Sequence, residues 1–182
     1  MNDADLVRIS KRLSLHLRHA PERIGLTLDR GGWVAVADLL AALSRHGLRL
    51  TRAELDEVVT RNDKQRFAYD PTGTRIRASQ GHSTPVELDL PPVPPPPVLF
   101  HGTVQGNLAA IERDGLRPMA RHDVHLSATV DTAVAVGQRR GRPVVLRLDA
   151  AAMARDGYEF RVSANGVWLT ASVPPEYLAR EP

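Results

Sequence analysis

The stretch Pro91-Pro92-Val93-Pro94-Pro95-Pro96-Pro97 divides the sequence into two parts. Proline has no backbone N–H and a fixed φ, so this run can form neither a helix nor a central strand. An extended polyproline spacer is expected instead. A ligand for another domain is disfavoured, because the run lies between two segments with globular patterning. We therefore expect a first lobe over residues 1–83, a linker over 84–98 and a second lobe over 99–182.

Before the linker, the patterning predicts three helices followed by a hairpin. Apolar spacing and stop signals place the helices over residues 3–19, 36–43 and from 52 onward, the last opened by a capping box in Thr51-Arg52-Ala53-Glu54. Period-two alternation places hairpin strands over 66–69 and 75–78. This order matches a winged helix, a common nucleic-acid-binding arrangement.

After the linker, short strands alternate irregularly with helices. We expect strands over 98–103, 124–126, 144–148 and 167–170, and helices over 105–113 and 132–136. Within Arg117–Ser127, Val124 and Leu126 should face the core and His125 should face away. There is no βαβ alternation, so the chain is expected to be α+β, with a small mixed β core in the second lobe.

Composition excludes several classes of chemistry. The chain has no cysteine, which removes disulfides, thiolate metal sites and cysteine nucleophiles. No apolar run approaches the roughly 18 residues of a membrane span, and the N-terminus lacks signal-peptide features, so no membrane partner and a cytoplasmic location are expected. Residues 1–83 carry 14 Lys/Arg against 10 Asp/Glu, and the remainder 10 against 11. The basic excess of the first lobe is compatible with nucleic acid.

The sequence lacks the most familiar cofactor-binding and catalytic motifs. Neither a dinucleotide-binding glycine motif nor a P-loop is present, and Ser127 is not in a nucleophile elbow. His122, His125 and His101 could suggest zinc, but residues 124–127 read as strand and no carboxylate motif accompanies them, so no metal is expected.

Arginine is the residue type that stands out. It occurs at element ends and turns, at Arg18, Arg66, Arg121 and the Arg139-Arg140 pair. Arginine binds phosphate bidentately, which favours a phosphate site; the competing interpretation is a scatter of surface arginines. For Arg18 and His19, the alternative is cations that stabilise a helix C-terminus.

Seven short segments follow one another along the chain: Ser10–Ser14 with Leu17-Arg18-His19, Asn62–Phe67, Arg77–Ser83, His101-Gly102-Thr103, Gly115–Met119, Arg121 with Val124–Ser127, and Asn165–Leu169. In this order they resemble the motifs of the NAD-dependent RNA 2'-phosphotransferases, which remove a splice-junction 2'-phosphate from tRNA. The resemblance covers almost the whole chain outside the linker. Departures from the family pattern are Asp123, where histidine is usual, and Ser79, where asparagine is usual.

The resemblance implies a winged-helix RNA lobe and an ADP-ribosyltransferase-like NAD lobe, with the RNA 2'-phosphate held between them. The implied catalytic set is Arg18, His19, Arg66 and Arg121. The implied NAD-binding residues are His101, Gly102, Thr103, His125, Leu126, Ser127 and Val167. Val167 takes a position where many ADP-ribosyltransferases have glutamate. Arg139 and Arg140 are expected either to meet the NAD diphosphate or to form a solvated pair.

The implied reaction transfers the 2'-phosphate of a tRNA-like RNA to NAD in two steps, through an ADP-ribosylated 2'-phosphate. Its products are 2'-OH RNA, nicotinamide and ADP-ribose 1″,2″-cyclic phosphate, and the enzyme is expected to be a monomer without metal. Two alternatives remain. One is an ADP-ribosyltransferase that caps nucleic-acid phosphates and stops after the first step, and the other is a non-enzymatic RNA-binding adaptor.

Overall fold

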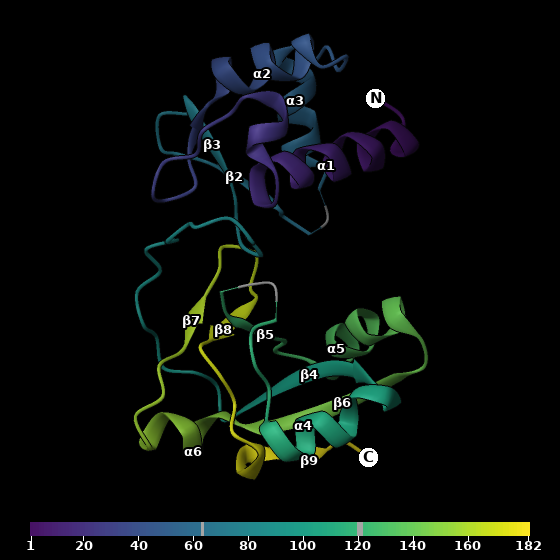
Figure 1. The fold of residues 1–182 in the computed structure, drawn as a ribbon, viewed down its shortest axis with the longest axis vertical. Coiled ribbons are helices and arrows are strands. Elements are labelled where there is room, and N and C mark those ends of the chain that lie inside the picture. The colour runs from purple at the N-terminus through teal and green to yellow at the C-terminus, as the bar shows by residue number, and fades with distance from the viewer. Residues whose placement is uncertain (63, 120–121) are drawn as a thin grey trace. The chain divides into compact units, whose positions relative to one another are not determined.

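A computed structural model describes residues 1–62, 64–119 and 122–182 of the chain. It divides into two compact units, Met1–Asp89 and Leu90–Pro182, which we call the first and second units (Figure 1). Each contains helices and a small β structure, so the α+β class is confirmed. Among the described residues, no helix is long and apolar enough to cross a membrane.

Over its described residues, the first unit consists of three α-helices and a three-stranded antiparallel sheet. The helices are α1 (Asp3–Arg18), α2 (Val36–Arg45) and α3 (Arg52–Thr60), and a 3₁₀ turn, η1 (Pro21–Ile24), follows α1. The strands are β1 (Val34–Ala35), β2 (Phe67–Tyr69) and β3 (Arg75–Ala78), in the order β1-β3-β2. The predicted helices and hairpin are confirmed. Strand β1, with two residues, was too short for periodicity to reveal.

Side-chain caps set where two of these helices begin. The Oδ1 of Asn2 accepts a hydrogen bond from the backbone N–H of Asp5 at 2.8 Å, at the start of α1. At the start of α3, the Thr51 Oγ1 accepts from the N–H of Glu54, whose carboxylate accepts from the N–H of Thr51 at 2.7 Å. This is the predicted capping box, and it satisfies backbone donors that would otherwise lack partners.

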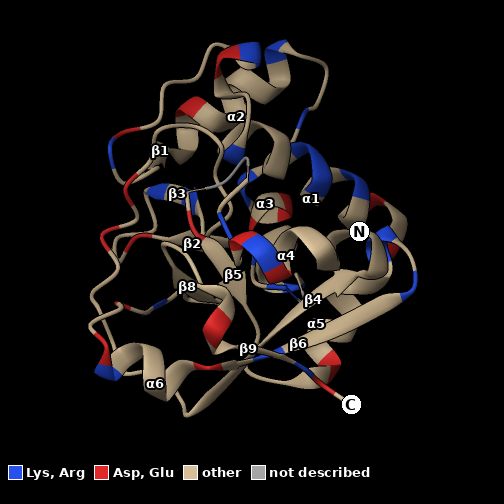
Figure 2. Cartoon of the chain, turned by 60° about the horizontal axis from the view of Figure 1, so that its bottom comes forward, with Lys and Arg blue, Asp and Glu red and all other residues tan. Residues whose placement is uncertain are grey.

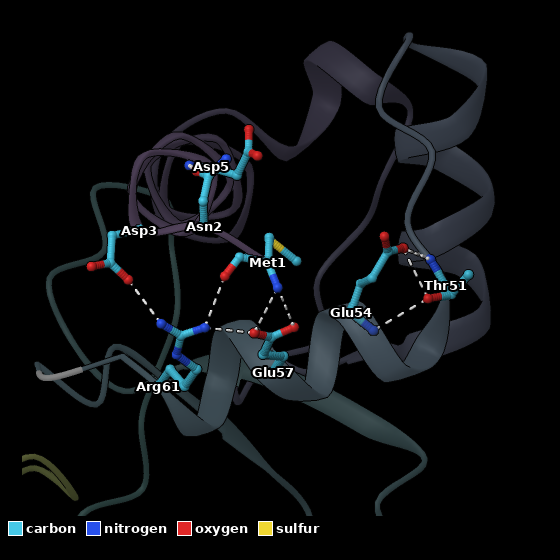
Figure 3. Close-up of polar contacts among 8 residues, drawn as sticks. All are labelled: Met1, Asn2, Asp3, Asp5, Thr51, Glu54, Glu57 and Arg61. Carbon is cyan, nitrogen blue, oxygen red and sulfur yellow. Dashed lines mark hydrogen bonds and ion pairs between the residues drawn. The ribbon is translucent and has the colours of Figure 1, made fainter.

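An ion-pair network ties the start of α1 to the end of α3 (Figure 3). The Glu57 carboxylate accepts from the Met1 ammonium at 3.0 Å and from the Arg61 guanidinium at 2.6 Å. Arg61 also donates to Asp3 at 2.8 Å and to the carbonyl of Met1 at 2.9 Å. The two helices are therefore joined at this end by side chains more than fifty residues apart in sequence.

The core of the first unit is formed by side chains of its helices and its sheet. Its fully buried large side chains come from α1, α2, α3 and β3: Leu13, Leu17, Leu39, Leu43, Leu55 and Ile76. Burying one such side chain contributes roughly 1.5–3 kcal/mol relative to exposure. Leu17 immediately precedes Arg18 and His19, so core packing fixes the end of α1 from which these two residues project.

In the second unit, residues 90–119 and 122–182 form two three-stranded sheets. One has the order β4-β6-β9 and the other β5-β8-β7, and every described strand pair is antiparallel. The bounds of the strands are β4 (Val98–Val104), β5 (Val124–Leu126), β6 (Pro143–Asp149), β7 (Arg161–Val162), β8 (Trp168–Thr170) and β9 (Leu178–Arg180). A bridge between Phe100 and Ser127 joins the sheets. The expectation of one small mixed sheet is corrected, because periodicity along a strand does not specify its pairing partner or direction.

Helices pack on these sheets and their ends. They are α4 (Leu108–Asp114), α5 (Val130–Gly137) and α6 (Ala150–Arg155), with 3₁₀ turns η2 (Gln105–Asn107), η3 (Gln138–Arg140) and η4 (Pro175–Tyr177). Helix α5 packs on β4 and β6 (Figure 1). Helix α6 and strand β9 were not predicted, since each is too short to show a periodic pattern. The core is built around Leu99, Leu126, Leu148, Met153, Phe160 and Leu169.

Candidate active site

Arg18, His19 and Arg66 lie close together in the first unit. The Arg18 Nη2 donates to the carbonyl oxygen of Arg66 at 3.4 Å, so the end of α1 meets the residue that precedes β2. His19 is the C-cap of α1, and its backbone N–H donates to the carbonyl of Leu15 at 3.0 Å. His19 is exposed and the two arginines are partly exposed. Two guanidinium groups and an imidazole thus lie at one end of α1.

The backbone around Arg66 is held by Ser79. Gln65 has a φ of 40°, which residues other than glycine adopt infrequently. The Ser79 Oγ donates to the Gln65 carbonyl at 2.8 Å, and the Ser79 N–H donates to the Arg66 carbonyl at 2.8 Å. Ser79 is buried. Serine at this position, a departure from the family pattern, therefore stabilises the turn that presents Arg66.

A second pair of residues holds the Arg66 side chain. Its Nη1 donates to the Ser10 Oγ at 3.5 Å, and the Asn62 Nδ2 donates to the same oxygen at 2.8 Å. The Asn62 Oδ1 in turn accepts from the backbone N–H of Arg66 at 3.4 Å. Sequence reasoning assigned no role to Ser10 or Asn62. Their presence in the segments that carry the family resemblance was the only available signal.

The segment after β3 returns to the end of α1. The backbone N–H groups of Ser83 and Thr84 donate to the Arg18 carbonyl at 2.9 and 3.3 Å. The Ser83 Oγ lies 2.9 Å from the Nδ1 of His19. This hydroxyl therefore orients the imidazole through Nδ1. Sequence reasoning also missed this role of Ser83.

In the second unit, His101 and His125 come together from neighbouring strands. The His101 Nδ1 lies 3.1 Å from the carbonyl oxygen of His125. Burial lowers the pKa of His101; the bond to the His125 carbonyl opposes this shift, and the positive charge of Arg140 adds to it. His101 therefore tends to stay neutral. Its Nδ1 donates to the carbonyl, which leaves Nε2 as the acceptor of the neutral ring.

Ser127 and Val167 lie at the ends of the neighbouring paired strands. Ser127 exchanges backbone hydrogen bonds with Phe100 at 2.7 and 2.8 Å, beside His101 on β4. Val167 precedes β8, whose Trp168 pairs with Leu126 of β5. Leu126 is buried, as the alternation predicted, and its side chain belongs to the core of the second unit.

Gly102 and Thr103 are constrained by packing. A Cβ on Gly102 would lie 1.8 Å from the carbonyl oxygen of Ala133 in α5, a distance that real Cβ atoms do not show. Thr103 is buried, and its Oγ1 accepts from the Asn107 Nδ2 at 3.1 Å. These two residues therefore have structural roles in seating α5 and η2, whether or not they also touch a ligand.

Three predicted site residues remain, all of them arginines. Arg139 and Arg140 are exposed in η3, and the positive charge of Arg140 reaches His101. Arg121 lies outside the described residues. Burial raises the pKa of Asp123, while the positive charges of Arg161 and His122 oppose that shift.

Comparison with known proteins assigns the class. Residues 4–172 match the family described as RNA 2'-phosphotransferase, Tpt1 / KptA family. The chain belongs to this family, as its motifs indicated.

Among its relatives is a probable RNA 2'-phosphotransferase of Streptomyces coelicolor, 62% identical over 98% of this chain and 97% of that protein. Another of the same name, from Herpetosiphon aurantiacus, is 54% identical over the full length of both chains.

Proposed function

We propose that this protein removes an internal 2'-phosphate from RNA by transferring it to NAD. The observation that carries the proposal is the cluster of Arg18, His19 and Arg66, which the first unit holds with its own side chains. Two guanidinium groups suit a dianionic phosphate, and family membership makes an RNA 2'-phosphate the substrate that fits this cluster best. As part of the same proposal, the first unit is a winged helix and the second unit is ADP-ribosyltransferase-like.

In this proposal the two arginines stabilise charge on the phosphoryl oxygens. Electrostatic stabilisation of this kind acts most strongly as charge develops in the transition state, where one donor is worth about 2.7–4 kcal/mol. His19, oriented by the contact between its Nδ1 and Ser83, acts toward the phosphate as a hydrogen-bond donor or proton-transfer group. Arg121 completes the set by family resemblance.

The second unit would bind NAD as the co-substrate. The residues present fit such a molecule: His101, Ser127 and Arg140 combine hydrogen-bonding side chains with a positive charge, as ribose hydroxyls and a diphosphate require. His125 lies on β5, and Val167 immediately precedes β8, the strand that pairs with β5. NAD supplies an electrophilic ribose carbon with nicotinamide as its leaving group.

The proposed transfer has two bond exchanges. First, a 2'-phosphate oxygen bonds to the nicotinamide-ribose carbon as the bond to nicotinamide breaks. The ionised phosphate needs no general base, in keeping with Val167 where a glutamate would otherwise stand. The ribose O2″ then attacks the phosphorus, the bond from phosphorus to the RNA O2' breaks, and O2' takes up the proton lost by O2″. Its products are 2'-OH RNA and ADP-ribose 1″,2″-cyclic phosphate.

Incubation of a 2'-phosphorylated RNA with the protein, with and without NAD, tests the proposal. We expect NAD-dependent loss of the 2'-phosphate and formation of the cyclic phosphate. ADP-ribosylated RNA as the final product would identify a capping ADP-ribosyltransferase instead, and binding without turnover would identify an RNA-binding adaptor. Arg121→Ala is expected to block the second exchange, so that ADP-ribosylated RNA accumulates; full turnover by this variant would remove Arg121 from the mechanism.

A further inference from the structure

An open groove of about 1080 Å³ runs along α1 in the first unit. Its lining includes the apolar side chains of Val7, Leu15 and Ile24. Val7 and Leu15 are 54% and 37% exposed, although both are apolar residues on a helix that packs against a core. Exposed apolar residues in a hollow indicate a surface that is covered when a partner binds.

The rim of this groove is strongly basic. Arg8, Lys11 and Arg12 contribute from α1 and Arg23 from η1; we call these four residues and the hollow between them the basic groove. Lys and Arg positions recur along α1 in Figure 2. Asp3 is the acidic residue of the lining, and Asp5 pairs with Arg8 at 3.0 Å. Within the part of the chain that the structure describes, the side chains of Lys11 and Arg23 make no hydrogen bond or ion pair.

Several of the positive charges of the groove act on His16. Burial lowers the pKa of His16, the hydrogen bond to the Ala20 carbonyl opposes this, and the charges of Arg12, His46 and Arg23 lower it further. Arg12 is itself fixed in place, since its guanidinium donates to the carbonyl of His46. This concentration of cations on a surface that also exposes apolar atoms favours a polyanion as the occupant.

The position of the groove on α1 identifies which polyanion. Lys11 and Arg18 are seven residues apart, so they lie on one face of the helix about 10 Å from each other. Arg8 lies one turn further away. A chain whose phosphate is held at Arg18 and His19 would therefore meet a succession of cations if it continued along α1. The described lining contains no Phe, Tyr or Trp on which bases could stack, so the contacts would be with phosphates rather than bases.

We propose that the basic groove binds the sugar-phosphate backbone of the RNA substrate on one side of the nucleotide that carries the 2'-phosphate. The proposal rests on the function proposed above and deepens it. It makes Arg8, Lys11, Arg12 and Arg23 residues that hold flanking nucleotides without reading their sequence. An acidic protein segment is the competing occupant.

The salt dependence of RNA binding tests this inference. Each phosphate contact to a single strand contributes about 0.7 to the slope of log K against log salt concentration. The double variant Lys11→Gln/Arg23→Gln should therefore bind a single-stranded RNA more weakly, with a slope lower by about 1.4. The matched control Arg49→Gln/Arg155→Gln removes two exposed charges outside the groove lining and should leave the slope unchanged.

The RNA in this experiment carries no 2'-phosphate and NAD is left out, so binding is measured apart from turnover. If the groove variant shows the wild-type slope and affinity, the inference is wrong even if the wild type removes a 2'-phosphate. If the slope falls but no phosphate is ever transferred, the function proposed above fails while the groove stands.

A second variant, Val7→Glu, places a negative charge in the groove at an exposed position and should weaken RNA binding by repulsion. Binding of poly-glutamate that both variants abolish, with RNA binding intact, would assign the groove to a protein segment and overturn the proposal. Thermal unfolding of each variant confirms that it is folded.

Discussion

Replacement of Gly102 by alanine should destabilise the second unit. The new Cβ would lie 1.8 Å from the Ala133 carbonyl oxygen, whereas ordinary van der Waals contact begins at 3.4 Å, so β4 and α5 must separate by about 1.6 Å. The obstructing atom belongs to a helix backbone, which cannot rotate away as a side chain can. Overpacking of this kind typically costs about 1–3 kcal/mol, and we expect the upper end of that range. For a unit of this size, about 3 kcal/mol lowers the Tm by roughly 12 °C or more.

The assay is thermal unfolding followed by circular dichroism, together with NAD binding by calorimetry. Gly106→Ala is the matched control, because a Cβ on Gly106 would meet nothing within 4 Å and the residue has no unusual φ. We expect the control to unfold like the wild type. If Gly102→Ala also unfolds like the wild type, the packing argument is wrong. If it then still loses NAD binding, the role of Gly102 lies in ligand contact alone.

Three further changes should have measurable effects. Ser83→Ala removes the hydroxyl beside His19, a contact worth about 0.5–1.5 kcal/mol. It should lower kcat roughly two- to tenfold without changing the KM for NAD. Ser83→Thr should restore activity, and equal rates for wild type and both variants would exclude the positioning role. Thr51→Ala disrupts the capping box with Glu54 and should cost about 1 kcal/mol, read as a lower Tm that Thr51→Ser recovers. Because the pKa of His101 is lowered in the folded state, the unfolded state takes up the proton at a higher pH than the folded state as the pH falls. Stability should therefore fall as the pH drops below 6.5. His101→Gln should flatten this pH dependence, as measured by denaturant titrations.

Local sequence signals predicted most of the regular elements. The alternation in Val124-His125-Leu126 predicted a strand with its two apolar residues buried, because a strand places successive side chains on opposite faces. The capping box at Thr51 and the stop at Gly115 marked helix ends for similarly local reasons. The elements that were missed, such as β1 and α6, are stabilised by contacts with distant parts of the chain.

The candidate site was predicted unevenly. Arg18, His19 and Arg66 emerged from a family resemblance, not from spacing, which left a scatter of surface arginines as an alternative. The side chains that hold them, Ser10 and Ser83, could not be identified in this way. Their hydrogen bonds span 56 residues to Arg66 and 64 residues to His19, and such pairings depend on how helix and hairpin pack.

For this chain, the order of residues was sufficient for whatever depends on neighbours within a few positions: helix caps, the alternation of strands and the family motifs. The partner of each strand, the close approach of Gly102 to α5 and the hydrogen bonds around Arg66 required the folded chain. They arise from contacts between segments far apart in sequence, whose formation depends on the packing of both cores and leaves no periodic pattern in either segment.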